Sequence, residues 1–341
     1  MHRVFISYSH TDKDDPKVHN ILEVLKNNGL TSTYDKNLLG GWDFKKQIEV
    51  LISHCDIFIA ILSENSEKSG WVQAEIGYAM SKNIPILPIS IDETEPGHMI
   101  SQLQAPQWVG SDEEKNSIIK RYKLMLEIEE SNPTYECADN RYQRTGMLVE
   151  YASNIIKLGF FGEIRQIAGL SSFHIPNKGI HNSAWDKRYT GMKKPSDPEL
   201  ELLLKERKTL QLHGDATEYY LIINPDFTFK NKDARKARIE ELLEFLNVNI
   251  DNPNLKIVID NTIHYGRNLT IVGDWFTADA YHSTLDDGYS QTLFTRHAPT
   301  VRKQVEIFDA RFNELLNNQK ISDMSSVQVV IDRLESILKN L

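Results

Sequence analysis

Trp71 and Glu75 lie four residues apart in the segment SGWVQAEIGYAMSKNIPILPI, which spans residues 69–89. Because positions i and i+4 share one face of a helix, the two side chains would point the same way. A carboxylate can stabilise the positive charge that develops at a sugar carbon when a glycosidic bond breaks, and an indole can stack on a planar leaving group. The pair is therefore a minimal set for cleaving a glycosidic bond whose leaving group departs without a proton.

The same two residues also have an ordinary structural interpretation. A glutamate in the first turns of a helix complements the helix macrodipole. An indole can pack at the rim of a sheet. An isolated W-x-x-x-E pattern does not distinguish these interpretations from a catalytic one.

The chain up to about residue 92 alternates between strand-like and helical segments. Apolar runs with β-branched and aromatic residues indicate strands at RVFISYS, LTSTYD, DIFIAILS and IPILPISI. Apolar residues at helical spacing lie between them, as in PKVHNILEVLKNNG, where Gly29 is a candidate C-cap. This alternation predicts an open parallel α/β sheet.

A length of 341 residues favours about two domains. We assign residues 1–130 to the first domain, 131–160 to a charged helical connector, and 161–341 to a second domain. The second domain combines the strand-like EYYLIINP, NLKIVIDN and NLTIVGDWF with the helical KDARKARIEELLEFLN, and ends in two amphipathic helices. It is therefore also predicted to be α/β.

Composition excludes several classes of protein. A net charge of −9 and a pI of about 5.7 disfavour direct binding to nucleic acid or to anionic lipids. The chain has no signal-peptide pattern and no apolar run of about 18 residues, so we expect a cytoplasmic protein that does not span a membrane. Cys55 and Cys137 have no zinc-type spacing, so we expect neither a metal site nor a disulfide framework.

Four ordered motifs make residues 1–130 similar to bacterial TIR domains, namely FISYSHTDKD, YDKNLLGGWDF, CDIFIAILSENSEKSGWVQAEIGYA and IPILPI. The resemblance implies a flavodoxin-like parallel sheet of five strands with helices on both faces, which binds its ligand outside the carboxyl ends of the strands. It also implies that Glu75 is the catalytic glutamate of the NAD-cleaving members, with Trp71 as the aromatic residue that precedes it. NAD would then be the substrate, and no cofactor is expected.

The resemblance extends to four further candidate site residues. Asp35 and Trp42 would contact the dinucleotide or form an assembly contact beside the Gly40–Gly41 pair. Ser7 and Tyr8 are candidates for contacts with ribose or phosphate, or are polar residues at a strand end with no further role. Activity would depend on self-association through the TIR domains.

The function implied is that of an NAD+ glycohydrolase, which cleaves the nicotinamide–ribose bond to give ADP-ribose or a cyclic isomer. Such an enzyme would act as an antiphage defence or signalling effector that is activated by assembly. The main alternative is a non-enzymatic TIR adaptor, and a third possibility is glycosyl transfer from other nucleotides. The chain contains neither a G-x-G-x-x-G fingerprint nor a Walker loop, which removes the main support for a dehydrogenase or a kinase.

The second domain faintly resembles a degenerate phospholipase D-like fold around HYGRNLTIVGDWFTAD. The lysine of the H-x-K pair is missing after His264, which argues against a phosphodiesterase. A cyclic-nucleotide sensor of the STING or SAVED type is the other possibility, with a long loop at 171–198 as its lid. Either version would bind a nucleotide or protein activator, and the residues to inspect are Arg267, Asp274, Trp275, Arg296 and His297.

Overall fold

The computed structural model describes residues 3–33, 44–129, 135–168, 196–225, 232–262, 267–282, 289–319 and 326–341. The chain divides into two compact units, residues 1–134 and residues 135–341. Each unit has its own sheet and its own hydrophobic core. In the described residues, no helix is long and apolar enough to cross a membrane.

The first unit is built on a parallel sheet with the strand order β2-β1-β3-β4. Its strands are β1 (Arg3–Ser7), β2 (Thr31–Thr33), β3 (Ile57–Leu62) and β4 (Ile86–Ser90). All six residues of β3 are buried, as the uninterrupted apolar sequence IFIAIL predicts for a strand covered on both faces. The sequence pattern therefore identified a strand that is covered on both faces.

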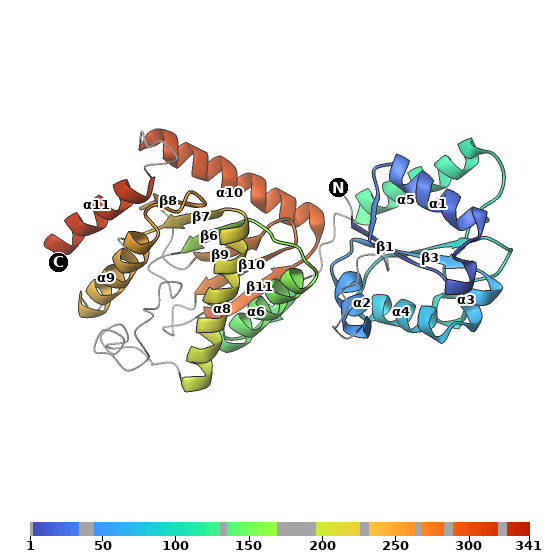
Figure 1. Cartoon of the computed structure of the whole chain (residues 1–341), viewed down its shortest axis with the longest axis horizontal. Coiled ribbons are helices and arrows are strands. Elements are labelled where there is room, and N and C mark those ends of the chain that lie inside the picture. Colours follow the sequence, from blue (N-terminus) through green and yellow to red (C-terminus); the bar gives the residue numbers. More distant parts are fainter. Residues whose placement is uncertain are drawn as a thin grey trace. The chain divides into compact units, whose positions relative to one another are not determined.

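Helices cover both faces of this sheet (Figure 1). They are α1 (Pro16–Asn27), α2 (Phe44–Ser53), α3 (Glu64–Lys68), α4 (Gly70–Ser81) and α5 (Asp112–Glu129). Helices α1 and α5 lie on one face, while α2, α3 and α4 lie on the other. Helix α1 begins at Pro16, after the Asp15 cap, and ends two residues before Gly29, whose φ of 74° favours glycine.

The described part of this sheet has four strands, whereas the sequence analysis predicted five. Beyond β4, pairing is limited to one parallel bridge between Ser90 and Gln107. Ser90 exchanges backbone hydrogen bonds with the carbonyl of Pro106 and the amide of Trp108. Pro106 has no N–H to extend the ladder, so this edge carries a bridge in the place of a strand.

The second unit contains a seven-stranded mixed sheet in the order β5-β11-β10-β9-β6-β7-β8. Strands β6, β7 and β8 are parallel, and the remaining neighbours are antiparallel. The strands are β5 (Glu136–Ala138), β6 (Ile164–Ala168), β7 (Tyr219–Ile223), β8 (Leu255–Ile259), β9 (Arg267–Val272), β10 (Phe276–His282) and β11 (Tyr289–Thr295).

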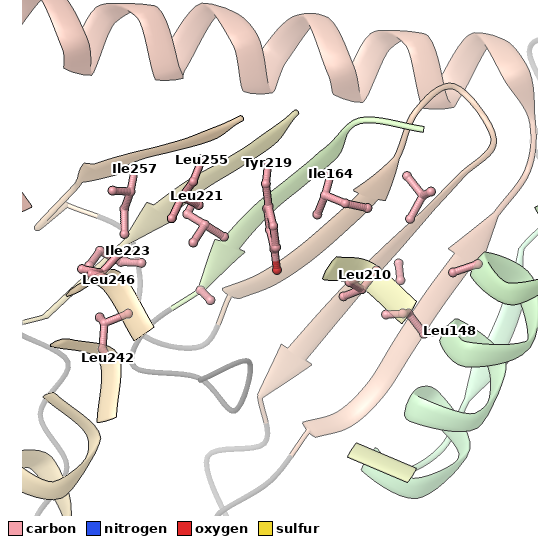
Figure 2. Packing of buried hydrophobic residues seen from close by; sticks show 14 of the residues in the cluster. Leu148, Ile164, Leu210, Tyr219, Leu221, Ile223, Leu242, Leu246, Leu255 and Ile257 are labelled. Atoms are coloured by element: carbon pink, nitrogen blue, oxygen red, sulfur yellow. The ribbon is translucent and has the colours of Figure 1, made fainter. Parts of the chain in front are cut away.

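In the described part of this unit, the helices that pack on the sheet are α6 (Arg141–Lys157), α8 (Asp197–Ala216), α9 (Lys232–Val248), α10 (Ala298–Asn318) and α11 (Ser326–Lys339). The core on one face joins α6, α8, α9 and α11 to the strands, and Figure 2 shows part of it. Phe308 and Phe312 of α10 pack on the opposite face, against Ile222 and Ile271. The sheet is therefore buried on both sides.

The expected connector at 131–160 differs from what the structure shows. Helix α6 contributes Leu148, Ala152 and Ile155 to the core of the second unit, and β5 pairs with β11. These apolar positions are about one turn apart, so they form a buried stripe along one side of the helix. The helix is therefore part of the second unit rather than a connector between domains. Most of the predicted loop at 171–198 lies outside the described residues.

His213 joins α8 to two other parts of the second unit. The side chain is fully buried. Its Nδ1 accepts a hydrogen bond from the Gly162 N–H at 3.1 Å, and its Nε2 lies 3.0 Å from the carbonyl oxygen of Ala152. Because a carbonyl only accepts, the proton of the neutral ring belongs on Nε2. Burial lowers the pKa of His213, and the hydrogen bond to Ala152 opposes that shift.

We expect the second unit to lose stability when the pH falls below about 6.5, the ordinary pKa of histidine. The folded pKa of His213 is depressed, so its contribution is fully present above that pH and is lost as the pH falls through the folded pKa. Urea unfolding at pH 7.5 and 5.5 tests this expectation. His213→Asn should reduce the pH dependence, whereas His19→Asn, at an exposed position of α1, should retain it. Equal pH dependence in wild type and His213→Asn would contradict the expectation.

Candidate active site

The first component of the site is the carboxyl end of β1. Side chains alternate between the two faces of a strand, so Ser7 and Tyr8 point in opposite directions. Tyr8 packs against the core beneath α1 and α5. Ser7 is buried on the face covered by α2 and α4. The structure therefore separates two residues that the sequence analysis grouped as ligand contacts.

The second component is α4, which presents Glu75 to that face. The helix begins after Ser69, whose hydroxyl accepts the backbone N–H of Val72. Val72, Ile76 and Ala79 recur at helical spacing and are buried against the sheet. Glu75 lies next to Ile76 on this buried side, and its side chain is only 7% exposed.

The carboxylate of Glu75 accepts a short hydrogen bond from the Ser7 hydroxyl. Both residues are buried, and 68 positions of sequence separate them. A glutamate that complements the macrodipole would lie in the first turn and face solvent. Glu75 lies beyond the first turn of α4, where the macrodipole has less effect, and its carboxylate faces the end of β1.

An aromatic pair lies one turn before Glu75. The rings of Trp71 and Phe44 have their centroids 5.2 Å apart, at an angle of 37°. Trp71 is 41% exposed and Phe44 is 43% exposed. Two large rings that remain this exposed offer a stacking surface to a planar ligand. The sequence analysis missed Phe44, although it is an aromatic residue at the start of a helical pattern.

A polar cluster lies at the carboxyl ends of β1 and β3, and its residues were not among the candidate site residues. Asp12 is buried and accepts hydrogen bonds from the Ser63 hydroxyl and from Asn65 Nδ2, the latter at 2.6 Å. Ser63 also caps α3 in a reciprocal arrangement with Ser66. The cluster ties the segment after β1 to the segment after β3. Its signal in the sequence is that polar residues follow two parallel strands.

The remaining candidates of the first unit lie outside the described residues. They are Asp35, Trp42 and the Gly40–Gly41 pair. Among the residues that the structure does describe, no group of three or more His, Cys, Asp or Glu side chains is arranged to hold a metal ion.

The candidates of the second unit that can be placed make structural contacts. Trp275 packs on the core and has its ring centroid 5.5 Å from that of Phe160. Arg296 forms an ion pair with Glu136 at 2.6 Å. His297 caps α10 and lies 2.8 Å from the Thr300 hydroxyl. Asp274 lies in the turn between β9 and β10, whereas His264 and the side chain of Arg267 lie outside the described residues.

Comparison with protein families identifies one domain. Residues 4–121 match a family model described as the TIR domain. The match covers the strands and helices that carry Ser7, Trp71 and Glu75. No curated protein matches the chain significantly.

Three solved structures resemble the chain at low identity. The TIR domain of the Toll-related receptor TRR-2 from Hydra magnipapillata is 17% identical, covers 37% of this chain and 97% of its own, and has a TM-score of 0.32. The Clostridium botulinum CMP N-glycosidase BcmB is 18% identical, with coverages of 36% and 98% and a TM-score of 0.27. A metazoan TIR-STING receptor from C. gigas is 12% identical, with coverages of 78% and 90% and a TM-score of 0.29. TM-scores this low assign neither a ligand nor an activity to this chain.

Replacing Ser7 by alanine should destabilise the first unit by about 1–3 kcal/mol, because a buried carboxylate loses a hydrogen-bond donor. Urea unfolding followed by circular dichroism measures the change. Ser81→Ala is the matched control, since Ser81 is exposed at the end of α4 and bonds only to the nearby Tyr78 carbonyl. If the two variants unfold at the same urea concentration, the Ser7–Glu75 contact does not stabilise the fold.

Proposed function

Residues 4–121 form a TIR domain, and we propose that this domain cleaves NAD at the bond between nicotinamide and ribose. One observation supports the proposal most strongly. Glu75 is a buried carboxylate held by Ser7 at the end of β1, one helical turn from an exposed indole. A carboxylate fixed in this way is preorganised to act on a positive centre.

The reaction requires little acid catalysis. The nicotinamide of NAD is a pyridinium, so when the C1′–N bond breaks, the bonding electrons neutralise the ring and nicotinamide leaves without a proton. The ribose carbon becomes an oxocarbenium-like cation. Water then forms the new C1′–O bond and releases a proton, which gives ADP-ribose. Attack by another group of the same molecule would give a cyclic isomer.

Glu75 would stabilise the cation electrostatically and accept hydrogen bonds from the ribose hydroxyls. Trp71, whose ring contacts that of Phe44, would stack on the nicotinamide and hold it in position. Ser7 would act as a positioning residue, because its hydroxyl fixes one oxygen of the carboxylate. These roles require no metal ion and no second carboxylic acid.

The proposal includes a latent state. Self-association of the TIR domains would complete the site, and the second unit would receive the activating signal, from a nucleotide or a protein. In antiphage defence, the enzyme would then deplete NAD in the infected cell. A non-enzymatic adaptor would share the assembly step but would release no nicotinamide.

Nicotinamide release from NAD tests the proposal. We expect the full chain to release nicotinamide when assembly is promoted by molecular crowding, and Glu75→Gln to lower the rate by about a hundredfold or more. Glu64→Gln is the matched control, because the Glu64 side chain is exposed on α3 and pairs with Lys68. NADP and nucleosides, assayed in parallel, test the wider possibility of glycosyl transfer from other nucleotides.

The oligomeric state of the same samples, measured by light scattering, makes the outcomes distinguishable. Equal release by wild type and Glu75→Gln, above the blank, would remove Glu75 from the reaction. Assembled wild-type protein that releases no nicotinamide would support the adaptor.

A further inference from the structure

A network of polar side chains crosses the central strands of the second unit. On the face covered by α6 and α8, the Tyr219 hydroxyl donates to Gln166 Oε1 at 2.7 Å, and Gln166 Nε2 donates to the Thr270 hydroxyl at 3.1 Å. Arg144 of α6 donates from Nη2 to Thr270 at 3.3 Å and to Asn268 Oδ1 at 3.1 Å. All five side chains are buried. With Glu206 of α8, they form what we call the polar network.

Two consecutive residues of α8 have charged atoms that remain without partners. Glu206 uses Oε1 to pair with Arg144 Nη1 at 3.2 Å. Its Oε2 is buried, and no group in the described part of the chain donates to it. Arg207 Nη1 is likewise buried and has no acceptor among the described residues. Burial lowers the pKa of Arg207, although Tyr219, Glu244 and Glu241 act on it electrostatically in the opposite direction.

The polar network lies within a hydrophobic core. Figure 2 shows Tyr219 among Leu221, Ile164 and Leu210, which belong to the same core cluster. Burying a polar atom without a hydrogen bond costs about 1–3 kcal/mol in proteins, and more for a charged group. Apolar side chains of similar volume would stabilise such a core equally well or better. The described part of the fold leaves Glu206 Oε2 and Arg207 Nη1 unmatched, and a ligand would satisfy both atoms.

Two buried hydroxyl groups also lack hydrogen-bond partners in the described residues. Thr145 follows Arg144 on α6. Thr292 lies on β11 and is paired with Ala280 of β10, which in turn is paired with Asn268 of β9. Neither hydroxyl has a hydrogen-bond partner in the described residues. The set therefore contains a guanidinium donor, a carboxylate acceptor, and two hydroxyls that can both donate and accept.

We propose that the polar network and Arg207 bind a phosphorylated sugar, either free or as part of a nucleotide. A desolvated guanidinium prefers an anionic oxygen as its acceptor, which a phosphate supplies. Glu206 Oε2 needs an O–H or N–H donor, which a sugar hydroxyl supplies. A phosphorylated sugar carries both groups on one small molecule. This site lies in the second unit, and a nucleotide bound there would be the activating signal named in the proposed function, on which that role rests. Binding itself does not depend on NAD cleavage by the TIR domain.

Calorimetric titration of the full chain tests the site with four probes, ribose 5-phosphate, AMP, ribose and inorganic phosphate. We use the Glu75→Gln background to prevent turnover. Ribose 5-phosphate should bind, while ribose and phosphate alone should bind at least tenfold more weakly, because each satisfies only part of the set. AMP tests whether the site accepts a nucleotide, and equal or tighter binding of AMP than of ribose 5-phosphate identifies the nucleotide as the source.

Arg207→Met should weaken the binding of ribose 5-phosphate by about tenfold to a hundredfold, as expected for the loss of a charged hydrogen bond. Lys208→Met is the matched control, since Lys208 is exposed on the same helix and its loss changes the net charge equally. Glu206→Gln, which keeps the side-chain shape, should weaken ribose 5-phosphate more than phosphate. Circular dichroism confirms that each variant is folded.

Two results would overturn the proposal. One is that none of the four probes binds to the folded full chain. The other is that Arg207→Met and Lys208→Met bind ribose 5-phosphate equally.

Discussion

The hydrogen bond between Ser7 and Glu75 is the contact on which the rest of the candidate active site depends. A carboxylate buried between a sheet and a helix is costly unless a donor reaches it. One donor is the hydroxyl of Ser7, the last residue of β1. The contact therefore requires that Ser7 point toward α4 and that Glu75 point toward β1. A shift of β1 by one residue would turn the hydroxyl to the other face of the sheet. A shift of α4 by one residue would rotate the carboxylate by about 100° around the helix axis.

The two faces of the first sheet therefore differ in the polarity of their side chains. Beneath α1 and α5 the described core is apolar, and Tyr8 packs there with its ring. On the other face, apolar side chains such as Phe5 and Phe58 stack in the interior, while polar groups appear where β1 ends. The polar groups of the candidate site therefore lie at the carboxyl edge of the sheet, outside its apolar interior. The exposed rings of Phe44 and Trp71 border the same region.

The second unit buries its polar groups differently. Its polar network lies across strands β7, β6 and β9 and includes Arg144 of α6 and Glu206 of α8. Its hydrogen bonds measure 2.7–3.3 Å, yet Glu206 and the neighbouring Arg207 each keep one atom without a partner in the described residues. In the first unit the Ser7 hydroxyl orients the Glu75 carboxylate at the end of one strand. In the second unit donors and acceptors are spread over several strands, which suits recognition of a ligand with several polar groups.

The sequence by itself determined the order of the four strands and of helices α1, α2 and α4 in residues 3–90, because continuous apolar runs and helical spacing are local signals. It did not predict the short helix α3. It also determined the similarity to TIR domains and the spacing of Trp71 and Glu75. Only the tertiary structure decided that Glu75 is buried against Ser7, that Tyr8 lies on the opposite face, that Phe44 pairs with Trp71, and that α6 belongs to the core of the second unit. The same holds for the polar network, whose members Arg144 and Thr270 are 126 positions apart. The physical reason is that burial and hydrogen bonding join residues distant along the chain, and a pattern that repeats every two or four residues carries no information about those partners.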